Sequence, residues 1–271
     1  MILDQVFHRF VDKRPIPVMA RVVLERVLTP ERLDEWFGRT TQRQYTRELL
    51  FSSLVNVMSL VAFKAFPSIH AAYQTVSDEI GVSVTSVYNK LNGVEPRTSG
   101  ALVRDTAREF AQVVEDVNGC RRAWLPGYRV KVLDGNCIAA TEHRLAVLRD
   151  TSAGPLPGKS LVVYDPSVEM AIDLFPCEDG HAQERALLGE VLSTVQPGDL
   201  WIMDRNFCVC AFLTGIKTRQ AQFICRQHLG FAFTPQGPER VIGNSETGRV
   251  YEQWIEVVPP DGGDAHRYRR I

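Results

Sequence analysis

The hydrophobic pattern of the chain changes its period near Gly127, and this change constrains the fold more than any other feature. From Val18 to about Asp116, apolar residues recur at helical spacings of three and four positions. After Gly127 they alternate at every second position, which is typical of strands with one buried face. The stretch 119–127 between the two patterns contains Pro126 and is a candidate linker. We therefore expect a helical domain over residues 1–120 and a strand-containing domain over residues 128–271.

The second half of the chain predicts an α/β fold. Two helical patterns, at about 179–196 and 207–219, separate the last three of five strand patterns, which lie at 128–134, 160–164, 168–175, 200–204 and 222–226. This order indicates a mixed sheet that begins with an antiparallel meander. Weaker alternation follows over residues 249–257 and again at the C-terminal end.

Two aspartates, Asp134 and Asp204, each close a short apolar strand and each precede an asparagine-bearing turn. Because side chains alternate across a strand, each carboxylate is expected to continue a core-facing row. A charge in such a row is costly unless it is paired or holds a metal, and two converging carboxylates can bind Mg²⁺ for phosphoryl transfer. The alternative is that each aspartate is an ordinary turn or helix-capping residue.

Polar residues beside the two aspartates are candidates for contacts with DNA phosphates. Arg205 and Asn206 follow the second aspartate directly, and His143 and Arg144 lie in the loop after the first strand. Alternatively, Arg205 forms a surface ion pair and Asn206 caps the next helix.

The N-terminal half contains two patterns found in DNA-binding proteins. Arg39, Arg43 and Arg47 are four residues apart, so on one helix they form a basic stripe, although solvated helix faces often have such a stripe. Residues 76–91 predict a helix, a glycine turn and a second helix, as in a helix-turn-helix, which is also a common way to pack two helices. In the DNA-binding form, the start of the second helix contacts the major groove with Ser83, Thr85, Ser86 and Asn89.

Composition narrows the class of protein only slightly. The 271 residues have a net charge of −1, so the whole molecule has no field suited to a polyanion. The chain contains no apolar run of the length, about 18 residues, that crosses a bilayer, and we expect a cytoplasmic, nucleoid-associated protein. Its six cysteines are not grouped as zinc ligands, and reduced, buried thiols are the simpler interpretation.

Four segments in this order resemble the DDE transposases of the fourth family of bacterial insertion sequences. They are residues 132–136 (VLDGN), 140–145 (ATEHRL), 179–185 (DGHAQER) and 199–207 (DLWIMDRNF). The resemblance implies a ribonuclease H-like catalytic domain that carries an inserted block of strands. It also implies that Asp134 and Asp204 are catalytic acids that bind Mg²⁺ or Mn²⁺. Water would first cut the end of the element, and the freed 3′-hydroxyl would then attack target DNA in line. The implied partners are the terminal inverted repeats, target DNA and a second copy of the chain.

The third acid of that family is the point at which this sequence departs from the pattern. The family places a glutamate in a Tyr, Arg, Glu, Lys motif beyond the inserted strands, and no Tyr-x-x-Arg-x-x-x-Glu spacing follows Asp204. Glu252 and Glu256 lie in an alternating, strand-like stretch instead. We therefore expect a C-terminally truncated, inactive transposase with an incomplete strand block. The alternatives are a non-catalytic DNA-binding fragment that inhibits a full-length enzyme, and a metal-dependent nuclease on the same fold.

Overall fold

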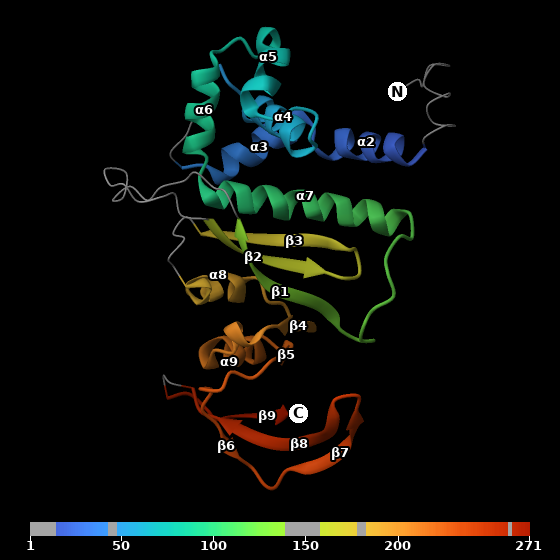
Figure 1. Cartoon of the computed structure of the whole chain (residues 1–271), viewed down its shortest axis with the longest axis vertical. Helices are drawn as coiled ribbons and strands as arrows, with labels where there is room; N and C mark the ends of the chain where they lie inside the picture. The colour runs from blue at the N-terminus through green and yellow to red at the C-terminus, as the bar shows by residue number, and fades with distance from the viewer. Residues whose placement is uncertain (1–14, 43–47, 139–157, 178–182, 260–261) are drawn as a thin grey trace. The chain divides into compact units, whose positions relative to one another are not determined.

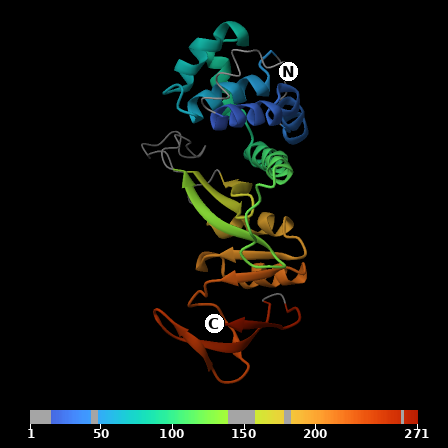
Figure 2. The same cartoon turned by 90° about the vertical axis from the view of Figure 1, so that its right-hand side faces the viewer.

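The computed structural model describes residues 15–42, 48–138, 158–177, 183–259 and 262–271 (Figures 1 and 2). The chain divides into two compact units. The first comprises residues 1–121 and 170–178, and the second comprises residues 122–169 and 179–271. Across the described ranges, no helix combines the length and the apolar character needed to cross a lipid bilayer.

The first unit is helical, as the spacing of its apolar residues predicts. Its elements are α2 (Pro15–Val27), α3 (Pro30–Thr40), α4 (Phe51–Ala62), α5 (Ile69–Ile80), α6 (Val84–Gly93), α7 (Pro96–Asp116) and one strand, β3 (Met170–Cys177). Its core includes Trp36, Phe37, Leu54 and Val87, and the rings of Phe37 and Phe51 stack with their centroids 4.7 Å apart. Burial of these large side chains is the main term that stabilises the helices, because isolated helices of this length are marginal in water.

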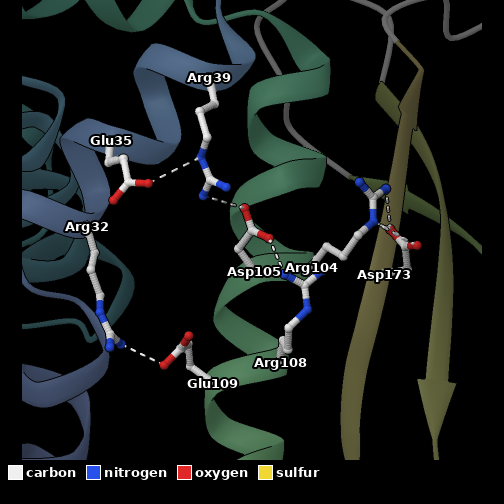
Figure 3. A network of polar contacts seen from close by, with 8 residues as sticks. All are labelled: Arg32, Glu35, Arg39, Arg104, Asp105, Arg108, Glu109 and Asp173. Carbon is white, nitrogen blue, oxygen red and sulfur yellow. Dashed lines mark hydrogen bonds and ion pairs between the residues drawn. The ribbon is translucent and has the colours of Figure 1, made fainter.

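Ion pairs attach the long helix α7 to its neighbours in the first unit (Figure 3). The Arg32 guanidinium of α3 lies 2.7 Å from the Glu109 carboxylate of α7. On the opposite side, Arg104 donates two hydrogen bonds from Nε and Nη2 to Asp173 of β3, at 3.1 and 2.8 Å. Because Asp173 is buried, this pair contributes more to the position of β3 than a solvated pair does.

The second unit contains the mixed sheet. Its strands β2, β1, β4 and β5 are neighbours in that order; β1 pairs antiparallel with β2 and parallel with β4, and β4 pairs parallel with β5. The bounds of the strands are β1 (Arg129–Ile138), β2 (Gly158–Asp165), β4 (Asp199–Met203) and β5 (Gln222–Cys225). Between them lie η2 (Glu184–Leu187), α8 (Leu188–Ser193), η3 (Arg205–Phe207) and α9 (Cys210–Thr218). The predicted fold class, helices followed by a mixed α/β sheet, is confirmed.

A second, antiparallel sheet follows in the region of weaker alternation. It consists of β6 (Thr234–Pro235), β7 (Arg240–Ser245), β8 (Gly248–Val257) and β9 (His266–Arg270), with β8 paired to each of the other three. Figures 1 and 2 show β7 and β8 as a long hairpin. Most of β7 is exposed, which accounts for its weak hydrophobic pattern.

A buried aspartate fixes the parallel pairing of β1 with β4. Asp199 is fully buried and lies opposite Arg129 in the register of the two strands. Its carboxylate accepts hydrogen bonds from Arg129 Nε, Lys131 Nζ and the Gln196 amide, each at 2.9 Å. The Lys131 ammonium also lies 5.2 Å from the ring centroid of Trp201, so β4 contacts this side chain twice.

We expect the Asp199→Asn substitution to lower the free energy of unfolding by about 3–5 kcal/mol, because it leaves the largely buried Lys131 ammonium without a counter-charge. Denaturation in urea, followed by tryptophan fluorescence, measures this change. Lys131→Met made in the Asp199→Asn background should restore part of the loss. Strict additivity of the two substitutions would show that Lys131 and Asp199 are not coupled.

Candidate functional site

The two aspartates singled out in the sequence come together at one edge of the mixed sheet. The parallel pairing of β1 with β4 ends with Leu133 opposite Met203, and Asp134 and Asp204 are the next residue on each strand. Asp204 therefore follows the carboxyl end of β4, and Asp134 lies at the carboxyl end of the parallel pairing, although β1 itself continues to Ile138. Open α/β sheets commonly bind ligands at such carboxyl ends. The condition under which the sequence predicts a joint site, that the two strands are neighbours, is met.

The expected burial of these aspartates is wrong. Asp134 and Asp204 are both exposed, whereas Leu133 and Met203 just before them are buried. Asp134 remains within β1, where it pairs with Val162 of β2, whereas Asp204 follows the last residue of β4. Asp134 Oδ1 accepts a hydrogen bond from the Gly135 amide at 2.8 Å, and Asp204 Oδ1 accepts one from the Arg205 amide at 2.6 Å. Asp204 thus also caps η3, so the capping alternative is correct for this residue.

A third carboxylate, which the sequence did not assign to the site, lies beside the pair. Asn206 donates a hydrogen bond from Nδ2 to Glu184 Oε2 at 2.6 Å. The other carboxylate oxygen lies directly over Gly135, where an added Cβ would be 2.5 Å from it. Arg185 holds the same turn from the next position, because its Nε donates to the Asn206 carbonyl at 2.8 Å. Asn206 is predicted from the sequence to cap a helix or to contact DNA, but its side-chain amide donates to Glu184 instead.

The donor set suits a cation of the magnesium type. Mg²⁺ usually keeps several waters and is bound by one or two carboxylates together with substrate phosphates. Asp134 and Asp204 provide such a pair, and neither Oδ2 has a hydrogen bond among the described residues. Within the described ranges, no three His, Cys, Asp or Glu side chains form a group that could hold a metal ion by themselves. The pair therefore fits a Mg²⁺ or Mn²⁺ ion whose coordination is completed by water and substrate.

Of the arginines and the histidine predicted to contact DNA phosphates, the structure describes only some. Arg205 is exposed and forms no ion pair with the described residues, so the surface-pair alternative is not observed. His143 and Arg144 lie outside the described residues, as do Arg43 and Arg47 of the expected basic stripe.

The basic stripe on a single helix is wrong, because α3 ends at Thr40. Thr41 has an extended backbone conformation, and its amide bonds back to the Phe37 carbonyl. The one described member of the stripe, Arg39, lies 3.8 Å from Glu35 and 3.7 Å from Asp105 of α7 (Figure 3). These pairs give Arg39 a role in attaching α3 to α7.

The helix-turn-helix predicted from the sequence has the expected local structure. Helix α5 ends at Gly81, whose φ of 69° gives the left-handed turn that favours glycine, and α6 begins after Ser83. Ser83 Oγ accepts a hydrogen bond from the Ser86 amide at 3.3 Å, so these two residues form the helix cap. Thr85 and Asn89 are exposed on α6 and remain available for contacts with a partner.

Two cysteines near Asp204 form a pair that the sequence did not indicate. Cys225 lies opposite Met203 on β5, and its Sγ is 3.5 Å from the Asp204 carbonyl oxygen. A hydrogen bond from the Cys225 thiol, with smaller contributions from the His228 backbone and the Arg185 charge, lowers the pKa of Cys208 to about 6. The same hydrogen bond, together with burial, raises the pKa of Cys225. Among the described cysteines only Cys208 is buried, so the expectation of buried thiols is correct for Cys208 alone.

Comparisons with known proteins leave the family of the chain open. No family model matches the chain, and no curated protein matches it. Among solved structures, it resembles the cryo-EM structure of the piggyBac transposase synaptic complex with hairpin DNA, with a TM-score of 0.38 and 10% sequence identity. The match covers 91% of this chain and 59% of that chain, so the present sequence spans less than two thirds of the neighbour's length.

The contact of Glu184 with Gly135 predicts a non-additive double-mutant cycle. Gly135→Ala should displace the Glu184 carboxylate and break its bond to Asn206, at a cost of about 1–2 kcal/mol in unfolding free energy. Glu184→Ala should cost about the same, since it removes the same bond. Once Glu184 is alanine, Gly135→Ala should be neutral or slightly stabilising. Equal costs of Gly135→Ala in both backgrounds, measured by urea denaturation, would disprove the contact.

The thiol pair predicts an unusually acidic cysteine. The thiolate absorbance of the folded protein near 240 nm should show one transition with a midpoint at about pH 6, and Cys208→Ser should abolish it. Cys225→Ala should move this midpoint upward, because the thiolate of Cys208 then loses its main hydrogen-bond donor. A wild-type protein whose thiols all titrate near the ordinary cysteine value of about 8.5 would contradict the assignment.

Proposed function

We propose that this chain is a DNA-processing protein of the DDE-transposase type, related to the fourth family of bacterial insertion sequences, in which Asp134 and Asp204 bind Mg²⁺ or Mn²⁺. The observation that carries the proposal is the register of β1 and β4, which makes these two exposed carboxylates direct neighbours at the carboxyl edge of the sheet. If the two aspartates were unrelated turn residues, nothing would require them to follow directly paired residues of two adjacent parallel strands. The proposal places the protein with bacterial DNA in the cytoplasm.

The residues at this edge would have distinct roles in a phosphoryl transfer. When bound, the ion supplies positive charge to the attacking and leaving oxygens of a phosphodiester. Asp134 and Asp204 would hold it, since each carboxylate has one oxygen that accepts no hydrogen bond from a backbone amide. Glu184 fixes Asn206 and the turn after β4, and it thereby orients Asp204, which begins that turn. Positioning and electrostatic stabilisation account for most of the catalysis of such reactions.

The first unit is proposed to bind the ends of the element. Its helix-turn-helix presents Thr85 and Asn89 on the exposed surface of α6, at the end of the helix that enters the major groove in proteins with this motif. Tyr73 steadies the turn, because its hydroxyl donates to the Val82 carbonyl at 2.6 Å. Two ends must be joined in transposition, so we propose that a second copy of the chain takes part.

The metal site is tested by Mn²⁺ titration followed by electron paramagnetic resonance. Asp134→Asn and Asp204→Asn should each weaken Mn²⁺ binding by at least about tenfold, because each removes a direct ligand. Glu190→Gln is the matched control, since Glu190 is an exposed acid on α8 of the same unit. Any Mg²⁺-dependent nicking of DNA by the wild-type chain should be lost in both aspartate variants.

Unchanged Mn²⁺ affinity in the two aspartate variants would refute the metal site. DNA binding then separates the remaining possibilities. A preference for one duplex sequence that persists in Asp134→Asn would leave a DNA-binding protein without catalysis. Metal-dependent nicking without any sequence preference would favour the nuclease.

A further inference from the structure

A basic cavity of about 530 Å³ lies beside the carboxylate pair in the second unit. It is lined by Arg185, Arg205, Asn206, Arg226, Gln227, His228 and Leu229. Three arginines thus line one cavity whose lining residues include no aspartate or glutamate. Like charges gathered in this way repel one another, and a bound polyanion relieves that repulsion.

The three arginines reach the cavity from separate segments of the chain. Arg205 follows β4 and Arg226 follows β5, so both leave the sheet at the same carboxyl edge as Asp134 and Asp204. Arg185 comes from η2, and its Nε is held by the Asn206 carbonyl. The cluster is therefore a product of the fold at this edge, since no run of basic residues in the sequence produces it.

These three arginines form no ion pairs with the residues that the structure describes. Arg205 and Arg226 are exposed, and neither guanidinium has an ion pair or a hydrogen bond there. Arg185 uses Nε for a neutral carbonyl, which leaves its charge unpaired within the described residues. His228 accepts a hydrogen bond at Nδ1 from the Gly230 amide, so its neutral ring carries a proton on Nε2 and adds a donor.

A second cavity, of about 350 Å³, shares Arg185 and Asn206 with the first. Its other lining residues are Lys159, Gln183 and Glu184. Cationic side chains thus continue from Arg226 and Arg205 through Arg185 to Lys159 at the start of β2. This spacing over several side chains suits a chain of phosphates better than a single small anion.

We infer that the two adjoining cavities form a track that binds the phosphodiester backbone of a DNA strand and leads it past Asp134 and Asp204. This inference rests on the proposed function, since it names how that site holds its substrate. Arg205 and Arg226 make the phosphate contacts, and Arg185 both contacts the strand and positions Asn206. Bases take no part, so the track is indifferent to sequence.

Fluorescence anisotropy of a labelled oligonucleotide in EDTA, over a series of salt concentrations, tests the track without metal. The double variant Arg205→Ala, Arg226→Ala should bind at least about tenfold more weakly at low salt. Its salt slope, log K against log[salt], should be shallower than that of the wild type by about 1.8 on a B-form duplex, or about 0.9 for each lost phosphate contact. Arg219→Ala is the matched control, because Arg219 is an exposed arginine at the end of α9 that does not line either cavity.

A charge-preserving variant separates a direct contact from a loss of folding. Arg205→Lys with Arg226→Lys should keep the wild-type salt slope and most of the affinity. Wild-type affinity and slope in the alanine double variant would overturn the track. Equal competition by inorganic phosphate at the same total phosphate concentration would also overturn it, because the cavity would then be a small-anion site.

The outcomes for the track and for the metal site are independent. A loss of Mn²⁺ binding in Asp134→Asn with unchanged DNA binding in the arginine variant would support the proposed function and reject the track. Weakened DNA binding in the arginine variant, with Mn²⁺ affinity that does not depend on Asp134, would support the track and reject the metal site.

Discussion

The parallel pairing of β1 with β4 is the constraint on which the second unit depends. At one end of the pair, the buried Asp199 accepts hydrogen bonds from Arg129 and Lys131, both of β1. At the other end, the same register makes Asp134 and Asp204 neighbours. A shift of one residue between the strands would turn side chains to opposite faces and separate the two carboxylates. A buried ion pair can cost as much in desolvation as it returns, so the contribution of Asp199 is better described as fixing the register than as adding stability.

The candidate site lies where β4 and β5 end, because the turns that follow these two strands start there and the register places Asp134 of β1 next to Asp204. Arg205 is the second residue after β4, and Arg226 is the first residue after β5, whose last residue is Cys225. Backbone groups at such an edge are no longer paired within the sheet. The Asp204 side chain satisfies one of them, the Arg205 amide. Structural hydrogen bonding and candidate chemistry therefore use the same few residues.

Sequence patterns predicted the features that depend on local spacing. The change of period near Gly127 separated helices from strands correctly, because both periods are properties of neighbouring residues. The proximity of Asp134 and Asp204 followed from two strand ends and one assumption about strand order. Their burial was predicted wrongly, because alternation does not show how far along a strand the face that it marks stays covered. The stripe from Arg39 was wrong for a similar reason, since charge spacing does not reveal that α3 ends at Thr40.

Contacts between distant segments could not be predicted from the sequence in the same way. Glu184 and Asn206 are separated by α8 and β4 in the chain, yet one hydrogen bond joins their side chains. The Glu184 carboxylate fits there because Gly135 has no Cβ, which would lie 2.5 Å from Oε1. Gly135 after Asp134 was the single local sign of a close approach, and such a glycine is equally common in an ordinary turn. The pairing of Cys208 with Cys225 has no sequence signal at all.

Carboxylates and guanidinium groups lie close together at this edge, yet they do not neutralise one another. Asp204 and Arg205 are adjacent in sequence, but the Asp204 carboxylate binds the Arg205 amide and not its guanidinium. Glu184 is occupied by Asn206, and Arg185 by the Asn206 carbonyl. An exposed ion pair between such groups would be worth at most about 1 kcal/mol, so it could not compete with a divalent cation on one side and phosphates on the other. The turn after β4 thus keeps both signs of charge available side by side, which is the arrangement that a cation-assisted reaction on a polyanion needs.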